Sequence, residues 1–331
     1  MIGKTLFILA DSDVPYRNQA VEEQLLRTVQ PGACILYLWQ NRRTVVIGRN
    51  QNGRAECRAE LLEQDGGYLA RRLSGGGAVF HDLGNLNFSF IAADPDYSVP
   101  RQQSVILAAV RSLGLDAEIS GRNDISVGGR KFSGNAFMSS GIRHCHHGTL
   151  LISADTSDMG RYLNVDPSKL QSKGVRSVRS RVVNLNELDG SITVGRVADA
   201  LKSAFAAEYG AAPETLDVRQ LDRQAVARLT DKFASDEWRL GAEPDFSYAR
   251  RQRFPWGGAE LLLQVSHSRI SGVRLFTDAL DAGLPGAVSD ALCGRPFSAA
   301  ALCGALRAQA DADPARRQAL LDISSLVMEV D

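Results

Sequence analysis

The chain has 331 residues, of which 38 are Lys or Arg and 38 are Asp or Glu, so its formal net charge is zero. This balance excludes the strong uniform field that draws a protein to nucleic acid or to an anionic membrane surface. Apolar residues make up 44% of the chain, which is enough for the cores of two domains and excludes a disordered chain.

The cysteines and the N-terminus indicate the compartment. Five cysteines form no CxxC pair and leave one over in any disulfide framework, which favours a reducing environment. The N-terminal stretch MIGKTLFILADSD has an apolar run too short for a signal peptide, and no stretch approaches the length of a membrane span. We therefore expect a cytoplasmic protein with no membrane partner, and the balanced charge predicts no nucleic-acid partner. The sequence is silent on oligomeric state, and a monomer is the default expectation.

Helices and strands are predicted throughout the first 240 residues. Residues 5–10 are expected to form a buried strand, and residues 14–29 a helix with one apolar face. Further strands are expected at 33–39, 44–49, 68–72, 78–82, 87–93, 125–127, 130–134 and 146–155, and further helices at 53–64, 102–113, 193–210 and 221–238. This mixture of antiparallel-looking strands with helices predicts the α+β class, with mixed sheets flanked by helices.

A second, smaller domain is expected after a break in the pattern near residue 245. The stretch EPDFSYARRQRFPWGG, residues 243–258, combines Pro, Gly and several charges and is typical of a boundary. Two strands at 259–265 and 270–276 and three helical segments follow it. We predict a catalytic domain over residues 1–245 and a small α+β accessory domain over residues 246–331.

Several standard signatures are absent. No GxGxxG, GxxxxGK[ST] or GxSxG stretch occurs, so the usual phosphate loops and a nucleophile elbow are not supported. His144, His146 and His147 surround Cys145 and suggest a metal site. In a strand, however, His144 and His146 share one face and His147 points away, so we expect a structural or orienting role for them.

The stretch RRLSGGGAVFHDLGN, residues 71–85, contains three consecutive glycines. These glycines form either a flexible turn or a loop whose bare backbone holds a ligand and whose N–H groups bind an anion. Apolar strands enter and leave the stretch, which favours a phosphate or carboxylate site. Arg71 and Arg72 alternate in direction, so at least one of them is expected to face the anion.

Lys131 lies in GGRKFSGNA on a predicted hairpin and is one of only six lysines, beside 32 arginines. It is either a solvated hairpin side chain or a compact charge that contacts a carboxylate and a phosphate together. The stretch GRND just upstream supplies Asn123 and Asp124. Asp124 can hold a magnesium ion through water.

Taken in order, RRLSGGGAVFHDLGN, GRND, GGRKFSGNAF, HHGTLL and KGVRSVRSRVVNL closely resemble the lipoate–protein ligases, in their two-domain bacterial form. NQAVEEQLLR and FPWGGAELLLQV match as well, so the resemblance covers nearly the whole chain. The stretch 211–235 is less similar, and the hairpin before Lys131 is a few residues shorter. The resemblance implies a biotin/lipoate ligase-like fold.

The resemblance also implies two half-reactions. The carboxylate of lipoate attacks the α-phosphate of ATP, with Mg2+ present, to give lipoyl-AMP and pyrophosphate. A lysine of an apo lipoyl domain then attacks this mixed anhydride to give an amide and AMP. The implied acceptors are the lipoyl domains of 2-oxoacid dehydrogenase E2 subunits and the glycine cleavage H protein.

The resemblance assigns roles to single residues, with Lys131 as the catalytic residue that contacts both lipoate and nucleotide. The implied ATP-binding residues are Arg72, Gly77, Ala78, Val79, Phe80 and Lys131. The implied lipoate-binding residues are Lys131, Arg72, Ser74, Gly75, Gly76, His81 and His147. Adenylate or loop contacts are implied for Asn123, Asp124 and Arg179. Arg179 lies in a basic stretch that we expect to close over the adenylate.

Two alternatives stay open. An octanoyltransferase that takes octanoate from acyl carrier protein resembles these ligases but needs a cysteine for a thioester intermediate. Cys145 is offset from both expected places for that cysteine. A non-catalytic lipoate-binding protein is the other alternative, and the retention of Lys131, Arg72 and the glycine loop argues against it. The arginine- and glycine-rich loop of biotin ligases is not evident.

Overall fold

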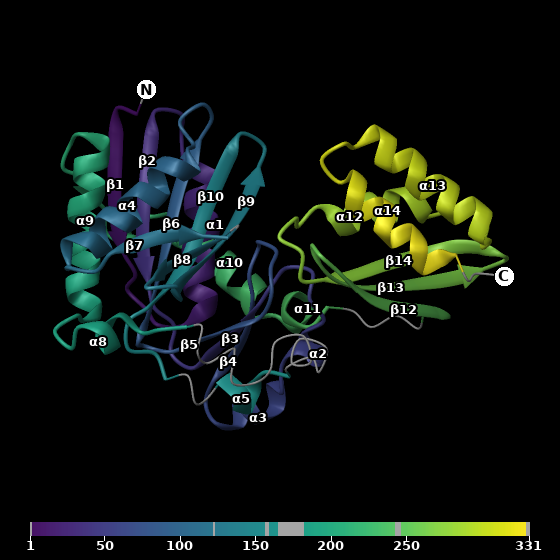
Figure 1. Ribbon diagram of the computed structural model, residues 1–331, viewed down its shortest axis with the longest axis horizontal. Coiled ribbons are helices and arrows are strands. Elements are labelled where there is room, and N and C mark those ends of the chain that lie inside the picture. The colour runs from purple at the N-terminus through teal and green to yellow at the C-terminus, as the bar shows by residue number, and fades with distance from the viewer. Residues whose placement is uncertain (1, 122, 156–158, 165–181, 242–245, 329–331) are drawn as a thin grey trace. The chain divides into compact units, whose positions relative to one another are not determined.

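The computed structural model (Figure 1) describes residues 2–121, 123–155, 159–164, 182–241 and 246–328. The chain divides into two compact units. The first comprises Met1–Val46, Arg54–Arg71 and Val79–Arg239, and the second comprises Ile47–Gly53, Arg72–Ala78 and Leu240–Asp331. The predicted boundary between residues 245 and 246 falls next to residues 242–245, which lie outside the described residues, so it stays a prediction.

A mixed eight-stranded sheet forms the centre of the first unit. Its spatial order is β11-β1-β2-β6-β10-β9-β8-β7. β1 pairs in parallel with β2 and β11, and the other neighbours are antiparallel. The bounds are β1 Lys4–Leu9, β2 Ala33–Trp39, β6 Asn85–Ala93, β7 Ala117–Ser120, β8 Asp124–Val127, β9 Arg130–Ser140, β10 Arg143–Leu151 and β11 Glu214–Thr215.

Helices cover both faces of this sheet (Figure 1). α4 (Val99–Ser112) packs with α9 (Val194–Tyr209) on one face, and α1 (Pro15–Thr28) packs with α10 (Arg223–Ala234) on the other. Consecutive residues of a strand point to opposite faces. Accordingly, Phe90 of β6 contacts α9, while its neighbour Ser89 contacts α1. Both faces of the central strands are therefore buried, and all nine residues of β6 are buried.

Short elements complete the first unit. A second sheet has the order β4-β3-β5, with β3 Thr44–Ile47, β4 Tyr68–Arg71 and β5 Val79–His81. The short helices are α2 Gly53–Glu56, α3 Ala59–Gln64, α5 Met159–Tyr162, α8 Leu185–Leu188, η1 Val218–Gln220 and α11 Asp236–Arg239.

Two predicted helices are interrupted. The prediction of one helix at 53–64 is wrong, because Cys57 leaves the helix to pair with Leu163. The predicted helix at 221–238 breaks at Ser235, whose backbone is extended and whose hydroxyl accepts a hydrogen bond from the N–H of Trp238 at 3.3 Å. A serine in this position starts a new helix, α11.

The second unit contains a three-stranded antiparallel sheet of β12 (Tyr248–Phe254), β13 (Gly257–Ser266) and β14 (Arg269–Thr277). Its helices are α12 Leu284–Leu292, α13 Ala299–Ala312, α14 Arg317–Ser324 and η2 Ser325–Val327. A separate apolar core joins this sheet to these helices. β12 lies in the stretch predicted to be a boundary, and three of its seven residues are arginines. An edge strand with mostly exposed side chains tolerates such charges.

No helix in the described part of the chain combines the length and apolar character that crossing a membrane requires.

A substitution at Phe90 tests how much the core of the first unit contributes to stability. Phe90 is fully buried, and its ring centroid lies 6.1 Å from that of Phe205. Phe90→Ala is expected to lower the free energy of unfolding by about 3–5 kcal/mol, since it removes a buried ring and leaves a cavity. Urea denaturation measures this change. Leu83→Ala is the control: Leu83 is 53% exposed, and the change is expected to stay within about 0.5 kcal/mol. Similar losses in both variants would contradict the packing described.

Candidate functional site

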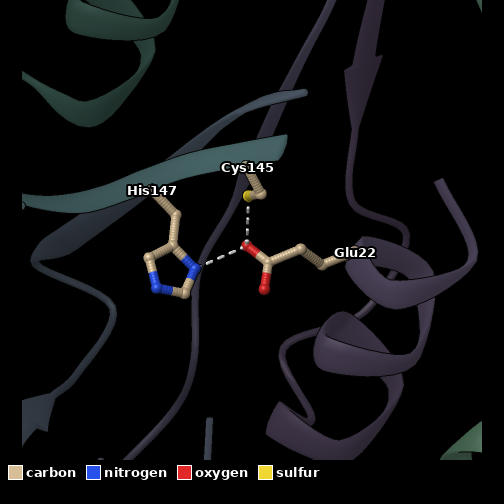
Figure 2. Close-up of side chains that lie close together, drawn as sticks. All are labelled: Glu22, Cys145 and His147. Carbon is tan, nitrogen blue, oxygen red and sulfur yellow. Dashed lines mark hydrogen bonds and ion pairs between the residues drawn. The ribbon is translucent and has the colours of Figure 1, made fainter. Parts of the chain in front are cut away.

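A buried carboxylate, Glu22 of α1, is the centre of a polar network on the α1 face of the large sheet (Figure 2). Its Oε1 accepts hydrogen bonds from Nδ1 of His147 at 2.8 Å and from the Ser89 hydroxyl at 2.5 Å. The Cys145 thiol lies 3.8 Å from the same oxygen. Ser89 in turn accepts a hydrogen bond from Nε1 of Trp39 at 3.0 Å. The network therefore ties α1 to β2, β6 and β10.

These hydrogen bonds decide the charge of Glu22. Burial alone would raise the pKa of Glu22, but the attraction of His147 and the hydrogen bonds from His147, Ser89 and Cys145 hold the pKa below its ordinary value. Burial and the neighbouring carboxylate raise the pKa of the Cys145 thiol well above its ordinary value. The site thus holds an anion beside a protonated thiol.

The Glu22, Cys145 and His147 side chains also form a candidate metal-ligand set, since their ligand atoms lie within 4.8 Å of one another. The hydrogen bonds described above already occupy these atoms. The network is thus satisfied without a metal ion, and we assign none to it.

The same network reaches His81 of β5. The His81 and Trp39 ring centroids are 6.4 Å apart, and Nδ2 of Asn41 lies 3.2 Å from Nδ1 of His81. The two histidines that the family resemblance assigns to lipoate, His81 and His147, are therefore linked through Trp39, Ser89 and Glu22. Sequence reasoning missed the three linking residues. Of the three, only Glu22 could have been identified from the sequence, because it is an acidic residue on the apolar face of its helix.

The three clustered histidines of β10 have separate partners. His144 contacts Asp94, His146 contacts Asn135 and Gln102, and His147 contacts Glu22. Cys145 and His147 point to the α1 face, and His146 points to the α4 face, as the strand alternation requires.

His146 is buried as a neutral ring. Burial, together with the nearby His147, lowers the pKa of His146 to about 3. Its Nε2 lies 2.8 Å from Oδ1 of Asn135, and its Nδ1 lies 3.1 Å from the amide of Gln102. The structure places Oε1 of Gln102 at Nδ1. A neutral imidazole that donates from Nε2 accepts at Nδ1, so we assign the Gln102 amide in the flipped orientation, with its NH2 group toward Nδ1. This orientation also gives a partner to the Gln102 nitrogen that otherwise has none.

Lys131 of β9 lies on the α1 face as well. The carbonyl of Lys131 accepts a hydrogen bond from the N–H of Val183 at 2.9 Å. On the other side, Lys131 pairs with Ser126 of β8, so its backbone is held on both sides. Its Nζ lies 2.7 Å from Oδ1 of Asp124, and the two side chains are 38% and 36% exposed. An ion pair this exposed adds little stability, so a ligand can displace Asp124 cheaply.

Lys131 of β9 and His147 of β10 lie on neighbouring strands. Nζ of Lys131 lies over Gly134, where a Cβ would come within 3.0 Å of it. Gly134 pairs with Thr149 of β10, two residues beyond His147 and therefore on the same face. Two residues of a strand span about 7 Å. One face of the sheet thus carries an accessible cation and, further along, the buried Glu22 network.

Asn123, an implied adenylate contact, has a structural partner. Its side-chain NH2 donates to the carbonyl of Asn135 at 2.9 Å, and the Asn135 side chain donates back to the Asn123 carbonyl at 2.9 Å. These bonds fix the start of β8, where Asp124 lies. Arg179 lies outside the described residues.

The glycine loop, residues 72–78, belongs to the second unit. The N–H of Gly76 donates to the carbonyl of Ala279 at 2.9 Å, and Gly76 has a left-handed φ of 94°. A Cβ on Gly75 would lie 2.4 Å from the same carbonyl oxygen. Both positions therefore require glycine for the fold. Gly77 differs, because a Cβ there would lie beyond 4 Å of every non-adjacent atom in the described residues.

Arg72 shapes this loop. Its guanidinium donates to the carbonyls of Gly75 at 2.7 Å and Gly77 at 2.9 Å, and to the Ser74 hydroxyl at 3.1 Å. The implied roles of Arg72 and Ser74 in ligand binding stay predictions. Ala78, the last residue of the loop, and Val79 after it are half-buried, and Phe80 is buried in the first unit and stacks on Tyr162.

Comparison with known families decides the identity. The family model described as "Lipoyl protein ligase A/B catalytic domain" matches residues 14–206, and "Bacterial lipoate protein ligase C-terminus" matches residues 243–322. Lipoate-protein ligase A of Psychrobacter cryohalolentis is 42% identical over 281 residues, 82% of each chain. This chain belongs to the lipoate–protein ligase family.

Solved structures of lipoate ligases confirm the predicted fold. LipL1 of P. falciparum in complex with lipoate matches with a TM-score of 0.85 at 26% identity, over 98% of this chain and 99% of that one. The bipartite lipoate protein ligase of Thermoplasma acidophilum, solved in a study with its E2 lipoyl domain, matches with a TM-score of 0.65 at 27% identity, over 75% and 100%. A lipoate-protein ligase A bound with ATP matches with a TM-score of 0.63 at 26% identity, over 73% and 99%.

His146 predicts a pH dependence of stability. The unfolded chain binds a proton at His146 below the ordinary pKa of 6.5, and the folded chain does so only near 3. The free energy of unfolding should therefore fall with decreasing pH between these values, by about 1.4 kcal/mol per pH unit from this residue. Urea denaturation at pH 6, 5 and 4 measures the slope. His146→Gln lacks the titrating group and should show a shallower slope; equal slopes would contradict a neutral buried ring.

Proposed function

We propose that this ligase-family protein activates lipoate with ATP and transfers the lipoyl group to a lysine of an acceptor lipoyl domain. One observation carries the proposal: a single face of the sheet holds the exposed Lys131 cation and, about 7 Å along β10, the buried Glu22 network. This arrangement suits an elongated acid whose carboxylate lies at Lys131 and whose other end lies near His147 and His81. Relatives solved with lipoate and with ATP support it.

In the first half-reaction, a carboxylate oxygen of lipoate attacks the α-phosphorus of ATP. The new C–O–P bond forms as the bond to the β-phosphate oxygen breaks, and pyrophosphate leaves with the electron pair. Lys131 exchanges its contact with Asp124 for the reacting carboxylate and phosphate. A fixed cation at a site of developing charge supplies several kcal/mol of transition-state stabilisation.

In the second half-reaction, the amine of an acceptor lysine attacks the carbonyl carbon of lipoyl-AMP. The C–N bond forms, the C–O bond to the phosphate breaks, AMP leaves with the electron pair, and the nitrogen loses a proton. The proposed acceptors are E2 lipoyl domains and the glycine cleavage H protein. The study of the T. acidophilum ligase with its E2 lipoyl domain supports the first of them. A monomeric, cytoplasmic protein stays a prediction.

One residue of this site, Asp124, has the chemistry to hold Mg2+. Magnesium binds through one or two carboxylates together with substrate phosphates and water. Asp124 offers one partly exposed carboxylate beside the amine of Lys131. Asp124 would therefore hold the ion, which would neutralise charge on the phosphates of ATP.

The octanoyltransferase alternative requires a reactive thiol. Cys145 is fully buried, and the pKa of its thiol is raised well above the ordinary value. A thiol in this state is a poor nucleophile. The structure of the site therefore favours the adenylating mechanism.

Lys131→Ala is expected to lower lipoylation by at least about 100-fold, because it removes the cation at the reacting centre. Intact-mass spectrometry of an apo lipoyl domain, incubated with lipoate and Mg-ATP, measures the lipoyl mass increment. Lys202→Ala, which removes a lysine that contacts Thr215, is the matched control and should retain the increment. Acyl transfer from octanoyl-acyl carrier protein without ATP, lost in Cys145→Ser, would contradict the proposal.

Two glycines of the loop are expected to differ in role, one in stability and the other in nucleotide binding. Gly75→Ala should lower the free energy of unfolding by about 1–3 kcal/mol, because its Cβ collides with the Ala279 carbonyl. Gly77→Ala has room and should leave stability unchanged. If ATP lies against Gly77, as we propose, this variant instead raises the KM for ATP, by roughly tenfold for a contact worth about 1.4 kcal/mol. An unchanged KM in Gly77→Ala would remove Gly77 from the nucleotide site.

A further inference from the structure

The segment 207–242 belongs to neither matched family model, since these cover residues 14–206 and 243–322. Up to Arg239 it belongs to the first unit, where it contains the end of α9 and forms β11, η1, α10 and α11. α10 packs along α1, and Nζ of Lys232 lies 2.7 Å from the buried carboxylate of Glu23. Residues 207–239 are therefore an integral part of the first unit.

Arg71 and Trp238 hold each other through hydrogen bonds in both directions. Arg71 is the last residue of β4 and is 6% exposed. Its Nε donates to the carbonyl of Trp238 at 2.8 Å, and its Nη2 donates to the carbonyl of Arg239 at 2.7 Å. Nε1 of Trp238 donates back to the carbonyl of Arg71 at 2.9 Å. We call these three residues the Arg71 clamp. At least one of Arg71 and Arg72 was expected to face an anion; the Arg71 guanidinium satisfies the last carbonyls of α11, and the prediction for Arg72 stays open.

Other contacts hold the clamp in place. The Trp238 ring meets the Phe233 ring edge to face at 5.5 Å, and the Lys232 amine lies 4.4 Å from its centroid. Nη1 of Arg239 donates to Glu63 at 2.6 Å and to the Tyr16 hydroxyl at 3.2 Å. The indole donor is therefore fixed by α1, α3 and α10, and this fixes the carbonyl that it binds.

The carbonyl that Trp238 binds belongs to the peptide bond between Arg71 and Arg72. Arg72 is the first residue of the glycine loop. We propose that Trp238 and Arg71 are positioning residues, which orient the start of the glycine loop for lipoate activation; this inference rests on the proposed function. A peptide held at its oxygen cannot rotate freely, so the hydrogen bond from Trp238 restricts the peptide that joins Arg71 to Arg72. A displacement of about 1 Å at a reacting group can cost about 100-fold in rate.

Trp238→Phe tests the proposal, because it removes the Nε1 donor and keeps an aromatic ring against Phe233. Trp256→Phe is the matched control, since Nε1 of Trp256 donates one hydrogen bond of 2.8 Å to Asp322 in the second unit. Two readouts are compared in both variants and the wild type: hydrogen exchange of the peptide that covers residues 72–78, and kcat/KM for lipoate in pyrophosphate release. Loss of one buried hydrogen bond corresponds to about a tenfold effect.

We expect Trp238→Phe to show about tenfold faster exchange in the loop and about tenfold lower kcat/KM for lipoate. Trp256→Phe should change neither, although both variants lose one indole hydrogen bond. Unchanged loop exchange in Trp238→Phe, or an equal loss of activity in Trp256→Phe, would overturn the proposal while the wild type remains active. The wild type is assayed first, before any variant is compared. If it releases no pyrophosphate with lipoate and ATP, the result contradicts the proposed function itself.

Discussion

The burial of the Glu22 carboxylate is the constraint on which the first unit depends. An ion this deep in the protein is tolerated only when hydrogen bonds and an opposite partial charge replace its water. His147, Ser89 and Cys145 supply these from two different strands, and Trp39 supports Ser89 from a third. The requirement to satisfy one carboxylate therefore fixes the position of α1 on the sheet. It also fixes the orientation of the side chains of the candidate site.

Strand alternation separates two roles within three consecutive residues of β10. Cys145 and His147 serve the α1 face, where the candidate site lies, while His146 serves the α4 face as part of the core. On β9 the alternation is interrupted, because Ser133 and Lys131 face the consecutive residues Ile125 and Ser126 of β8, and this bulge places Lys131 on the same face as Thr149. A linear site with a charged end and a buried polar end follows from the pleat of two strands.

Much of the fold could be predicted, because the helix at 14–29 and most strands have strong periodicity and short, clear turns. β12 could not, since its arginines hide the strand pattern at an exposed edge. The site was predictable only through the family resemblance. The hydrogen bond between Glu22 and His147 joins residues 125 positions apart, and no local pattern reports such a contact. The sequence indicated that the consecutive glycines have a specific role. It could not show why Gly75 must be glycine, because the carbonyl that a Cβ would meet belongs to Ala279, about two hundred residues away along the chain.

The chain passes between the two units at five points, because residues 47–53 and 72–78 belong with the C-terminal segment. Within that unit the N–H of Gly76 binds the carbonyl of Ala279, and the N–H of Thr277 binds the carbonyl of Asn50. The second unit is thus assembled from three separate pieces of chain. If the polypeptide were cut after Arg239, one fragment would carry both loops and the other would carry their backbone partners. The two short loops would then become the recognition surface through which a split enzyme reassembles.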